Sequence, residues 1–443
     1  MEVKPTEETY RSYLFFWSGQ LSSLFGSTVI NFVLLWWITI VTNSPVIISL
    51  GFFLNFLPLV IFQPIAGVCA DRFSKKKIIF IADSFQAGLT FILVLSFMMN
   101  FYSVGLVIIM NGLRGIGQAF HQPTVNSVIP SMVPEDKLSR INGINFLFAG
   151  MIQIVGSVTA GILWSIFGAQ NISLMLSIDV ITYFIMLIPL AIITIPSMRE
   201  VSIENPTSFA DDFREGISIV MKIPGLIILI VFCMFLNFLI TPVNTLLSYF
   251  IHNIHGGDST IYAVLGAIVN GGMIVGALFA SIKKKWNNKA RWLFVGTAAA
   301  LVNMIFFSIA PTGVFLWIMI GGFMFALFMP LINTLYMTIL QTAVPNDKYG
   351  RIVSIDSALS SIISPIGILI SGPLGAFFGV ANLFIYCAIL GIILTAIIWF
   401  FTGIKHVNYD SKVMLSEEEN LVEKKEMDDL ILETRKEEEK VVL

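Results

Sequence analysis

Arg114 is the one basic residue of this chain that falls inside a long apolar segment. Its guanidinium needs a counter-charge or a water-filled cavity there, because apolar surroundings cannot solvate the charge. Asn111, Gln118, His121 and Gln122 lie three, four, seven and eight positions from it, and therefore share one face of a helix with it. Such a face can handle protons or a substrate, and His121 can titrate near neutral pH. The alternative is a buried structural ion pair, which would give the same pattern of residues on this face.

Three carboxylates also lie inside apolar segments: Asp83, Asp179 and Asp356. Asp179 is the deepest of them, roughly 10 Å from the segment end at about 1.5 Å per residue. Burial disfavours a charged carboxylate, so Asp179 is a candidate proton carrier. The alternative is a structural hydrogen bond to a neighbouring helix. We expect Asp83 and Asp356, nearer the ends of their segments, to belong to a charge network at the inner membrane surface.

The elements that must position these groups are twelve apolar segments. Each reaches the roughly 20 residues that a helix needs to cross a bilayer. The chain is 56% hydrophobic and only 12% charged, which excludes a soluble globule without large exposed apolar patches. We therefore predict an all-α polytopic membrane protein. The segments span residues 14–41, 46–70, 78–99, 103–129, 141–166, 172–195, 224–252, 261–282, 292–310, 314–341, 352–378 and 381–403.

The basic residues predict the orientation of these segments. Apart from Arg114, every Lys and Arg falls before the first segment, after the last, or in every second gap between segments. By the positive-inside rule, both termini and these gaps are cytoplasmic. The first segment is too long for a signal peptide and should be kept in the protein. We expect a multi-pass protein of the inner (plasma) membrane in contact with membrane lipids.

The chain divides into two similar halves. Six segments lie on either side of a polar stretch at 196–223, and the sequence VPEDK at 133–137 recurs as VPNDK at 344–348, a shift of 211 positions. The same shift aligns Gly161 with Gly372. Two such repeats around a central path are typical of rocking secondary transporters. The predicted parts are a cytoplasmic N-terminus (1–13), an N-terminal half (14–195), a cytoplasmic linker (196–223), a C-terminal half (224–403) and a charged cytoplasmic tail (404–443).

Three motifs resemble those of the major facilitator superfamily. Residues 67–77 (GVCADRFSKKK) are similar to the signature between its second and third helices, although Ser74 replaces the usual Gly. Residues 111–118 (NGLRGIGQ) resemble the fourth-helix signature, and residues 156–161 (GSVTAG) the fifth-helix antiporter pattern, from which Ser157 and Ala160 depart. The resemblance covers residues 14–403. Its phrases look most like the macrolide efflux branch, which is near the enterobactin exporters.

The resemblance implies a twelve-helix major facilitator fold and roles for particular residues. Gly67, Asp71 and Arg72 would form a conformational latch between the halves. Arg114, Asp179, Gln118 and His121 would belong to proton coupling or the cavity. The first, fourth, seventh and tenth helices would line the path, so the substrate cavity would contain Ser27, Asn31, Asn237, Thr241, Asn244, Asn333 and Tyr336. The 38 Phe and 19 Met residues suit a bulky amphipathic substrate, because Met adapts to different shapes.

We therefore expect a secondary transporter that exports an amphipathic, macrolide-like drug in exchange for protons. One alternative keeps the fold but carries a siderophore or a lipid-like metabolite. Another is a membrane sensor or scaffold that does not transport. The chain has no Walker A sequence, and its three cysteines, Cys69, Cys233 and Cys387, lack metal-ligand spacing. We expect a monomer that is not an enzyme, with no cofactor, metal or nucleic-acid partner.

Overall fold

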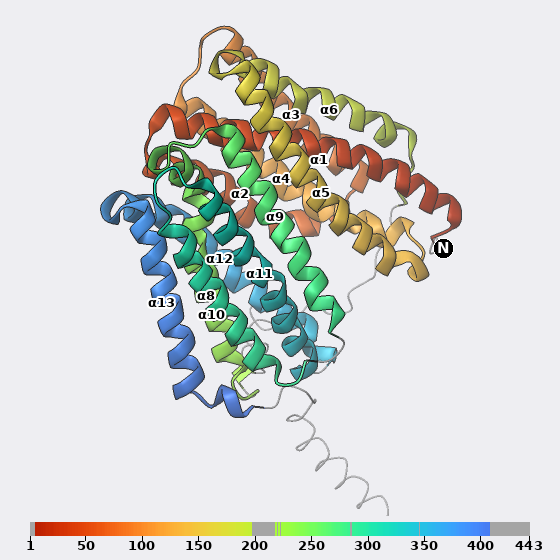
Figure 1. Cartoon of the computed structure of the whole chain (residues 1–443). Coiled ribbons are helices and arrows are strands. Elements are labelled where there is room, and N and C mark those ends of the chain that lie inside the picture. The colour runs from red at the N-terminus through yellow and green to blue at the C-terminus, as the bar shows by residue number, and fades with distance from the viewer. Residues whose placement is uncertain are drawn as a thin grey trace, which may run out of the picture.

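The computed structural model describes residues 5–196, 218, 220–221, 223–283, 286–344 and 346–407, without the side chains of residues 71, 346–348, 350, 351 and 354. Twelve α-helices make up nearly all of this part (Figure 1). They are α1 (Glu7–Thr42), α2 (Pro45–Arg72), α3 (Lys75–Met98), α4 (Val104–Met132), α5 (Glu135–Phe167), α6 (Ile172–Ile192), α8 (Leu226–Tyr249), α9 (Ser259–Ile282), α10 (Lys289–Ser308), α11 (Phe315–Ala343), α12 (Asn346–Phe378) and α13 (Val380–Phe401).

The predicted fold class is confirmed. Within the described residues, eleven helices are long and apolar enough to cross a membrane. The twelfth, α4, is long enough at 29 residues, but the polar face around Arg114 lowers its hydropathy. The helix that carries the expected chemistry is thus the one that a hydropathy scan alone would miss.

Several helices begin before the apolar segments that they contain. α1 starts at Glu7 rather than at residue 14, because Thr6 and Thr9 form a reciprocal capping box. α5 starts at Glu135 rather than at residue 141, with two acidic residues in its first turn, where negative charge stabilises a helix. An apolar run marks the part of a helix inside the membrane, whereas caps decide where the helix ends.

The helices form two groups. In the first helix group, α1–α6, the main packing pairs are α1–α5, α1–α6, α2–α4, α3–α4 and α3–α6. In the second helix group, α8–α13, they are α8–α12, α8–α13, α9–α11, α10–α11 and α10–α13. The groups meet chiefly through α2–α12 and α5–α9, with smaller contacts of α8 with α1 and α2.

The two groups are joined at one end of the helices, which we call the joined end. Here Thr39 on α1 donates a hydrogen bond to Ser248 on α8 at 2.9 Å. Asn253, just past α8, donates to Asn43 at 2.6 Å. The Tyr262 ring on α9 lies 5.5 Å from the Trp36 ring on α1. Away from these contacts the groups diverge, towards what we call the diverging end (Figure 1).

Two glycines allow the close approach at the joined end. A Cβ on Gly161 of α5 would lie 2.5 Å from Cβ of Ala263 and 2.9 Å from the backbone oxygen of Ser259, both on α9. A Cβ on Gly372 of α12 would lie 2.6 Å from the backbone oxygen of Pro45 on α2. The 211-residue shift aligns these two glycines, so corresponding positions of the two groups serve the same packing role.

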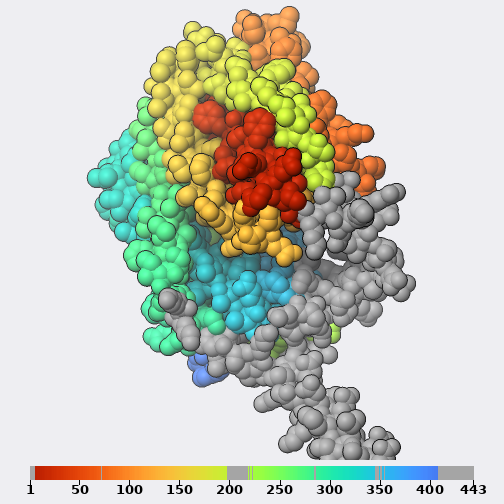
Figure 2. All heavy atoms as spheres, turned by 90° about the vertical axis from the view of Figure 1, so that its right-hand side faces the viewer, coloured from red at the N-terminus to blue at the C-terminus, as the bar shows by residue number. Residues whose placement is uncertain are grey.

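At the diverging end, the first helix group is held together by contacts between its own helices. Asn145 on α5 donates to the Tyr13 hydroxyl on α1 at 3.0 Å, and Lys137 forms an ion pair with Glu7. Figure 2 looks onto this end and shows the first turns of α1 (red) beside the start of α5 (gold).

The glycine contact at the joined end generates a testable prediction. Replacing Gly161 with Leu forces α5 and α9 apart, and overpacking of this kind costs about 1–3 kcal/mol. We expect a clearly lower melting temperature for the purified Gly161→Leu variant. Gly143→Leu on the same helix is the control, because a Cβ there would meet no atom within 4 Å. Equal melting temperatures for the two variants would contradict the close α5–α9 contact.

Candidate functional site

Arg114 and Asp179 form a buried ion pair that connects four helices. The Nη1 atom of Arg114 on α4 lies 2.8 Å from Oδ2 of Asp179 on α6, and the two residues are only 3% and 6% exposed. Thr90 on α3 donates to the same carboxylate oxygen at 2.7 Å and also contacts Arg114. Ser27 on α1 donates to the other oxygen at 3.3 Å. The charge of Arg114 is thus compensated within the protein.

Glycines beside Arg114 bring α4 close enough for this pairing. A Cβ on Gly112 would lie 2.9 Å from the backbone oxygen of Leu54 on α2, and a Cβ on Gly115 would clash with the backbone of Asn55. On the other side, a Cβ on Gly117 would lie 2.6 Å from the Gln86 side chain on α3. The glycines of the sequence NGLRGIGQ therefore explain how α4 packs tightly against α2 and α3 while it carries a large charged side chain.

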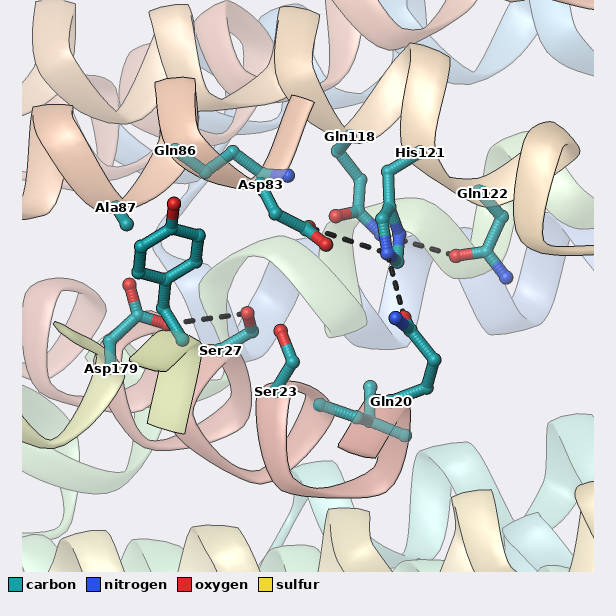
Figure 3. A pocket seen from close by; sticks show the side chains of 12 residues that line it. Gln20, Ser23, Ser27, Asp83, Gln86, Ala87, Gln118, His121, Gln122 and Asp179 are labelled. Carbon is teal, nitrogen blue, oxygen red and sulfur yellow. Dashed lines mark hydrogen bonds and ion pairs between the residues drawn. The ribbon is translucent and has the colours of Figure 1, made fainter. Parts of the chain in front are cut away.

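A second polar pair lies about two turns further along α4. Nε2 of His121 lies 2.9 Å from Oε1 of Gln20 on α1 and 3.3 Å from Oδ1 of Asp83 on α3 (Figure 3). Asp83 is only 5% exposed. The expectation that Asp83 belongs to a surface charge network was wrong, because α3 turns this carboxylate inwards against α4.

Both pairs border one small polar cavity of about 60 Å³, which has room for a few water molecules. Its lining comes from α1, α3, α4 and α6, and includes Asp83, His121 and Asp179. Ser27 and Gln118 also line it, and Gln118 donates to Gln122 at 3.1 Å. Figure 3 shows these side chains around the cavity. Gln118, His121 and Asp179, which were predicted for proton coupling or the cavity, thus line one cavity, and Arg114 is joined to it through its ion pair with Asp179. Ser27, which was predicted for the substrate cavity, also lines this polar cavity.

A second, larger cavity of about 270 Å³ lies towards the joined end. Its polar lining is uncharged: the amides of Asn31, Asn55, Asn111 and Gln153, with the hydroxyls of Thr28, Ser157 and Tyr262. Phe32, Phe52 and aliphatic side chains supply the rest. Asn111 comes from the same face of α4 as Arg114 and His121, so this helix lines both cavities. Tyr262 belongs to α9, which places the second helix group at the edge of the cavity.

Sequence reasoning assigned Asn31 to the substrate cavity but missed Asn55 and Gln153. The sequence does mark these two residues, since an amide inside an apolar segment is unusual and both lie inside such segments. They were passed over because α2 and α5 were not expected to line the path.

The predicted cavity residues of the second helix group are not in either cavity. Asn237, Asn244 and Asn333 are exposed, and Thr241 donates to the backbone of Asn237 at 2.8 Å. Tyr336 is buried and donates to Asp356 at 2.5 Å. Asp356 was expected in a surface charge network, and this was wrong, since it is 8% exposed and bonded inside the second helix group.

The predicted latch residues lie near the end of α2. A Cβ on Gly67 would meet no atom within 4 Å, and Arg72 is exposed. The Asp71 side chain lies outside the described residues. The three cysteines are unpaired, and the described residues contain no cluster of three or more His, Cys, Asp or Glu side chains suited to a metal ion.

Comparison with known proteins agrees with this architecture. Residues 16–365 match the family model of the Major Facilitator Superfamily. Macrolide efflux protein A of Streptococcus pyogenes is 27% identical over 374 residues, which cover 83% of this chain and 90% of that protein. The staphyloferrin A transporter of Staphylococcus aureus is 22% identical, covering 87% and 95% of the two chains.

Solved structures show the same fold. A bacterial homologue of the iron transporter ferroportin superposes with a TM-score of 0.67 at 13% identity, over 87% of this chain and 98% of that chain. This family and fold are those of membrane transporters, not of enzymes. The predicted resemblance is therefore confirmed: the chain belongs to the major facilitator superfamily and is a multi-pass membrane transporter.

Proposed function

We propose that this transporter exports an amphipathic, macrolide-like compound across the plasma membrane in exchange for protons. The observation that carries the proposal is the placement of two buried polar pairs, Arg114–Asp179 and His121–Asp83, next to an uncharged cavity lined by the same helix. Charged residues within a membrane span are costly and mark ion or substrate pathways. The similarity to macrolide efflux protein A supports the substrate class.

The larger cavity suits one part of such a compound. Macrolides combine an apolar lactone ring with oxygen-rich sugars, and the cavity combines aromatic rings with amides that can hydrogen-bond ether and hydroxyl oxygens. At about 270 Å³ it holds only a part of a large molecule. The rest would extend into the space where the two helix groups diverge.

Helix α4 is the element that links protons to the substrate. His121 lines the polar cavity and Arg114 is paired with Asp179, which also lines it, whereas Asn111 on the same face of α4 lines the larger cavity. A change of charge in the polar cavity shifts the preferred position of α4, and a substrate held by Asn111 biases that same position. Two ligands that act on one element are coupled reciprocally.

The basic residues give the proposed orientation. Lys75, Lys76 and Lys137 lie at the diverging end, so the positive-inside rule places this end in the cytoplasm. Both termini are then cytoplasmic, and the present arrangement is inward-facing. Export requires the joined end to separate and the cytoplasmic ends to meet. We propose that Gly67, Asp71 and Arg72 act as the latch in that second arrangement.

A siderophore is the second candidate substrate, because the chain is also similar to the staphyloferrin A transporter. Siderophores of the carboxylate class carry several negative charges. Among the described residues, no charged side chain lines the larger cavity, so an uncharged amphipathic drug suits it better than such a siderophore.

The proposed function predicts a specific transport activity. Proteoliposomes that contain the purified chain should move a radiolabelled macrolide against its gradient when a pH gradient is imposed, and collapse of that gradient by a protonophore should stop the transport. A carboxylate siderophore should not be moved under the same conditions. Macrolide movement that ignores the pH gradient contradicts proton antiport, and siderophore movement alone contradicts the substrate class.

The buried ion pair predicts that the shape of the Arg114 cation matters as well as its charge. A lysine cannot reproduce the planar, multi-donor contacts of a guanidinium, so Arg114→Lys should lose most of the gradient-driven transport at equal expression. Arg291→Lys is the matched control, since Arg291 is an exposed residue on α10. Normal transport by Arg114→Lys would mean that the site needs only a positive charge.

A further inference from the structure

Three buried polar atoms in the polar cavity have no hydrogen-bond partner among the described residues. They are Nε2 of Gln20, Oδ2 of Asp83 and Nδ1 of His121. Leaving such an atom unpaired costs about 1–3 kcal/mol. Gln20 and Asp83 are more than nine-tenths buried, and all three residues line the same cavity. Unpaired atoms gathered in one cavity are places where water, an ion or a proton can bind.

The hydrogen bonds identify where a ligand can bind. Nε2 of His121 faces two acceptors, Oε1 of Gln20 and Oδ1 of Asp83, so this nitrogen carries the hydrogen and donates. In a neutral imidazole, Nδ1 is then the unprotonated acceptor. Nδ1 and the second oxygen of Asp83 are therefore two open acceptor atoms, and either can take a single proton.

The charges around the cavity favour a proton at this place. The titratable residues that line it are Asp83 on α3, His121 on α4, and Asp179 and Tyr183 on α6. The lining residues of α1 are Gln, Ser and Leu, and α2 and α5 contribute none. Arg114 and Asp179 cancel each other. With a neutral His121, Asp83 leaves one net negative charge in a buried site, and one added proton neutralises it.

Asp179 is a poorer acceptor for this proton. Both of its oxygens are already in use, one by Arg114 and Thr90 and the other by Ser27. Protonating Asp179 would break the ion pair and leave the Arg114 guanidinium uncompensated at 3% exposure. Losing one partner of a buried pair is strongly destabilising.

We propose that the Asp83–His121 pair is the proton-binding site of this transporter, and that Arg114–Asp179 stays ion-paired while the proton is exchanged. This inference rests on the proposed proton antiport. The proton arrives from water, binds to the pair and returns to water on the other side, and no other bond forms or breaks. A proton fits the site better than a hard metal cation, which takes oxygen ligands rather than an imidazole nitrogen and an amide N–H.

Helix α3 connects this site to the ion pair. Gln86 and Thr90 lie three and seven positions after Asp83, so the three residues share one face of α3. Asp83 faces His121, the backbone oxygen of Gln86 accepts from Arg114 at 3.4 Å, and Thr90 contacts both Arg114 and Asp179. Loading or releasing the proton therefore alters the α3–α4 contact that also positions the ion pair.

The proton site can be tested without any substrate. In the purified full-length chain with ¹⁵N-labelled histidine, the ring signals of His121 are assigned by their loss in His121→Gln, since the chain has only four histidines. We expect proton binding to change the His121 ring signals, and Asp83→Asn to alter this response, because the two side chains bind the proton together. Asp136→Asn, which changes an exposed carboxylate, is the control and should leave the response unchanged. A His121 response that is absent, or that Asp83→Asn does not alter, overturns the proposal.

The role in coupling is tested by proton release. Addition of a macrolide to the weakly buffered wild-type protein should release about one proton per molecule, because binding and protonation are linked. Asp83→Asn and His121→Gln should still bind the macrolide but lose the release, whereas His406→Gln, a change at an exposed histidine, should keep it. Release that persists in Asp83→Asn and His121→Gln but disappears in Asp179→Asn moves the proton to Asp179 and overturns the inference. Wild-type binding without release, together with a titrating His121, leaves the proton site intact and contradicts proton antiport instead.

Discussion

The burial of one guanidinium determines much of the first helix group. Arg114 is 3% exposed inside a membrane helix, and removing its partner would cost about 3–5 kcal/mol. The pairing of Arg114 with Asp179 requires α4 and α6 to pack beside α3, where Thr90 contacts both residues. Ser27 of α1 completes the contacts of the carboxylate. The tight packing of α4 on α2, through Gly112 and Gly115, belongs to the same arrangement. One electrostatic requirement thus explains why a glycine-rich, polar helix lies inside the bundle.

The packing around Arg114 creates two cavities of different chemical character. The polar cavity gathers charged and titratable groups, whereas the larger cavity gathers amides and aromatic rings, and α4 borders both. In the proposed antiport, a proton and an amphipathic compound therefore need not compete for the same atoms in order to influence each other. In the proposed transport cycle, the contacts between the helix groups at the joined end must break when the protein opens to the other side.

The fold was accessible from the sequence because hydropathy, the placement of basic residues and the internal repeat all depend on local patterns. The repeat even aligned Gly161 with Gly372, whose shared packing role the structure explains. The pairing of side chains from different helices was not accessible. Helical spacing shows that Arg114 and His121 share a face, but it says nothing about which residue of α3 or α6 lies opposite. Asp83 was misassigned for this reason: its distance from the segment end suggested the surface, whereas the rotation of α3 buries it.

A double-mutant cycle measures whether Arg114 and Asp179 act as a unit. The melting of purified wild-type protein is compared with that of Arg114→Gln, Asp179→Asn and the variant with both changes. Each single change strands a buried polar partner, whereas the double change removes both charges together. We expect the double variant to be more stable than the sum of the two single losses implies, with a coupling free energy of about 0.5–3 kcal/mol. Additive losses would show that the two residues do not depend on each other, and that the buried charge of Arg114 is not compensated by Asp179.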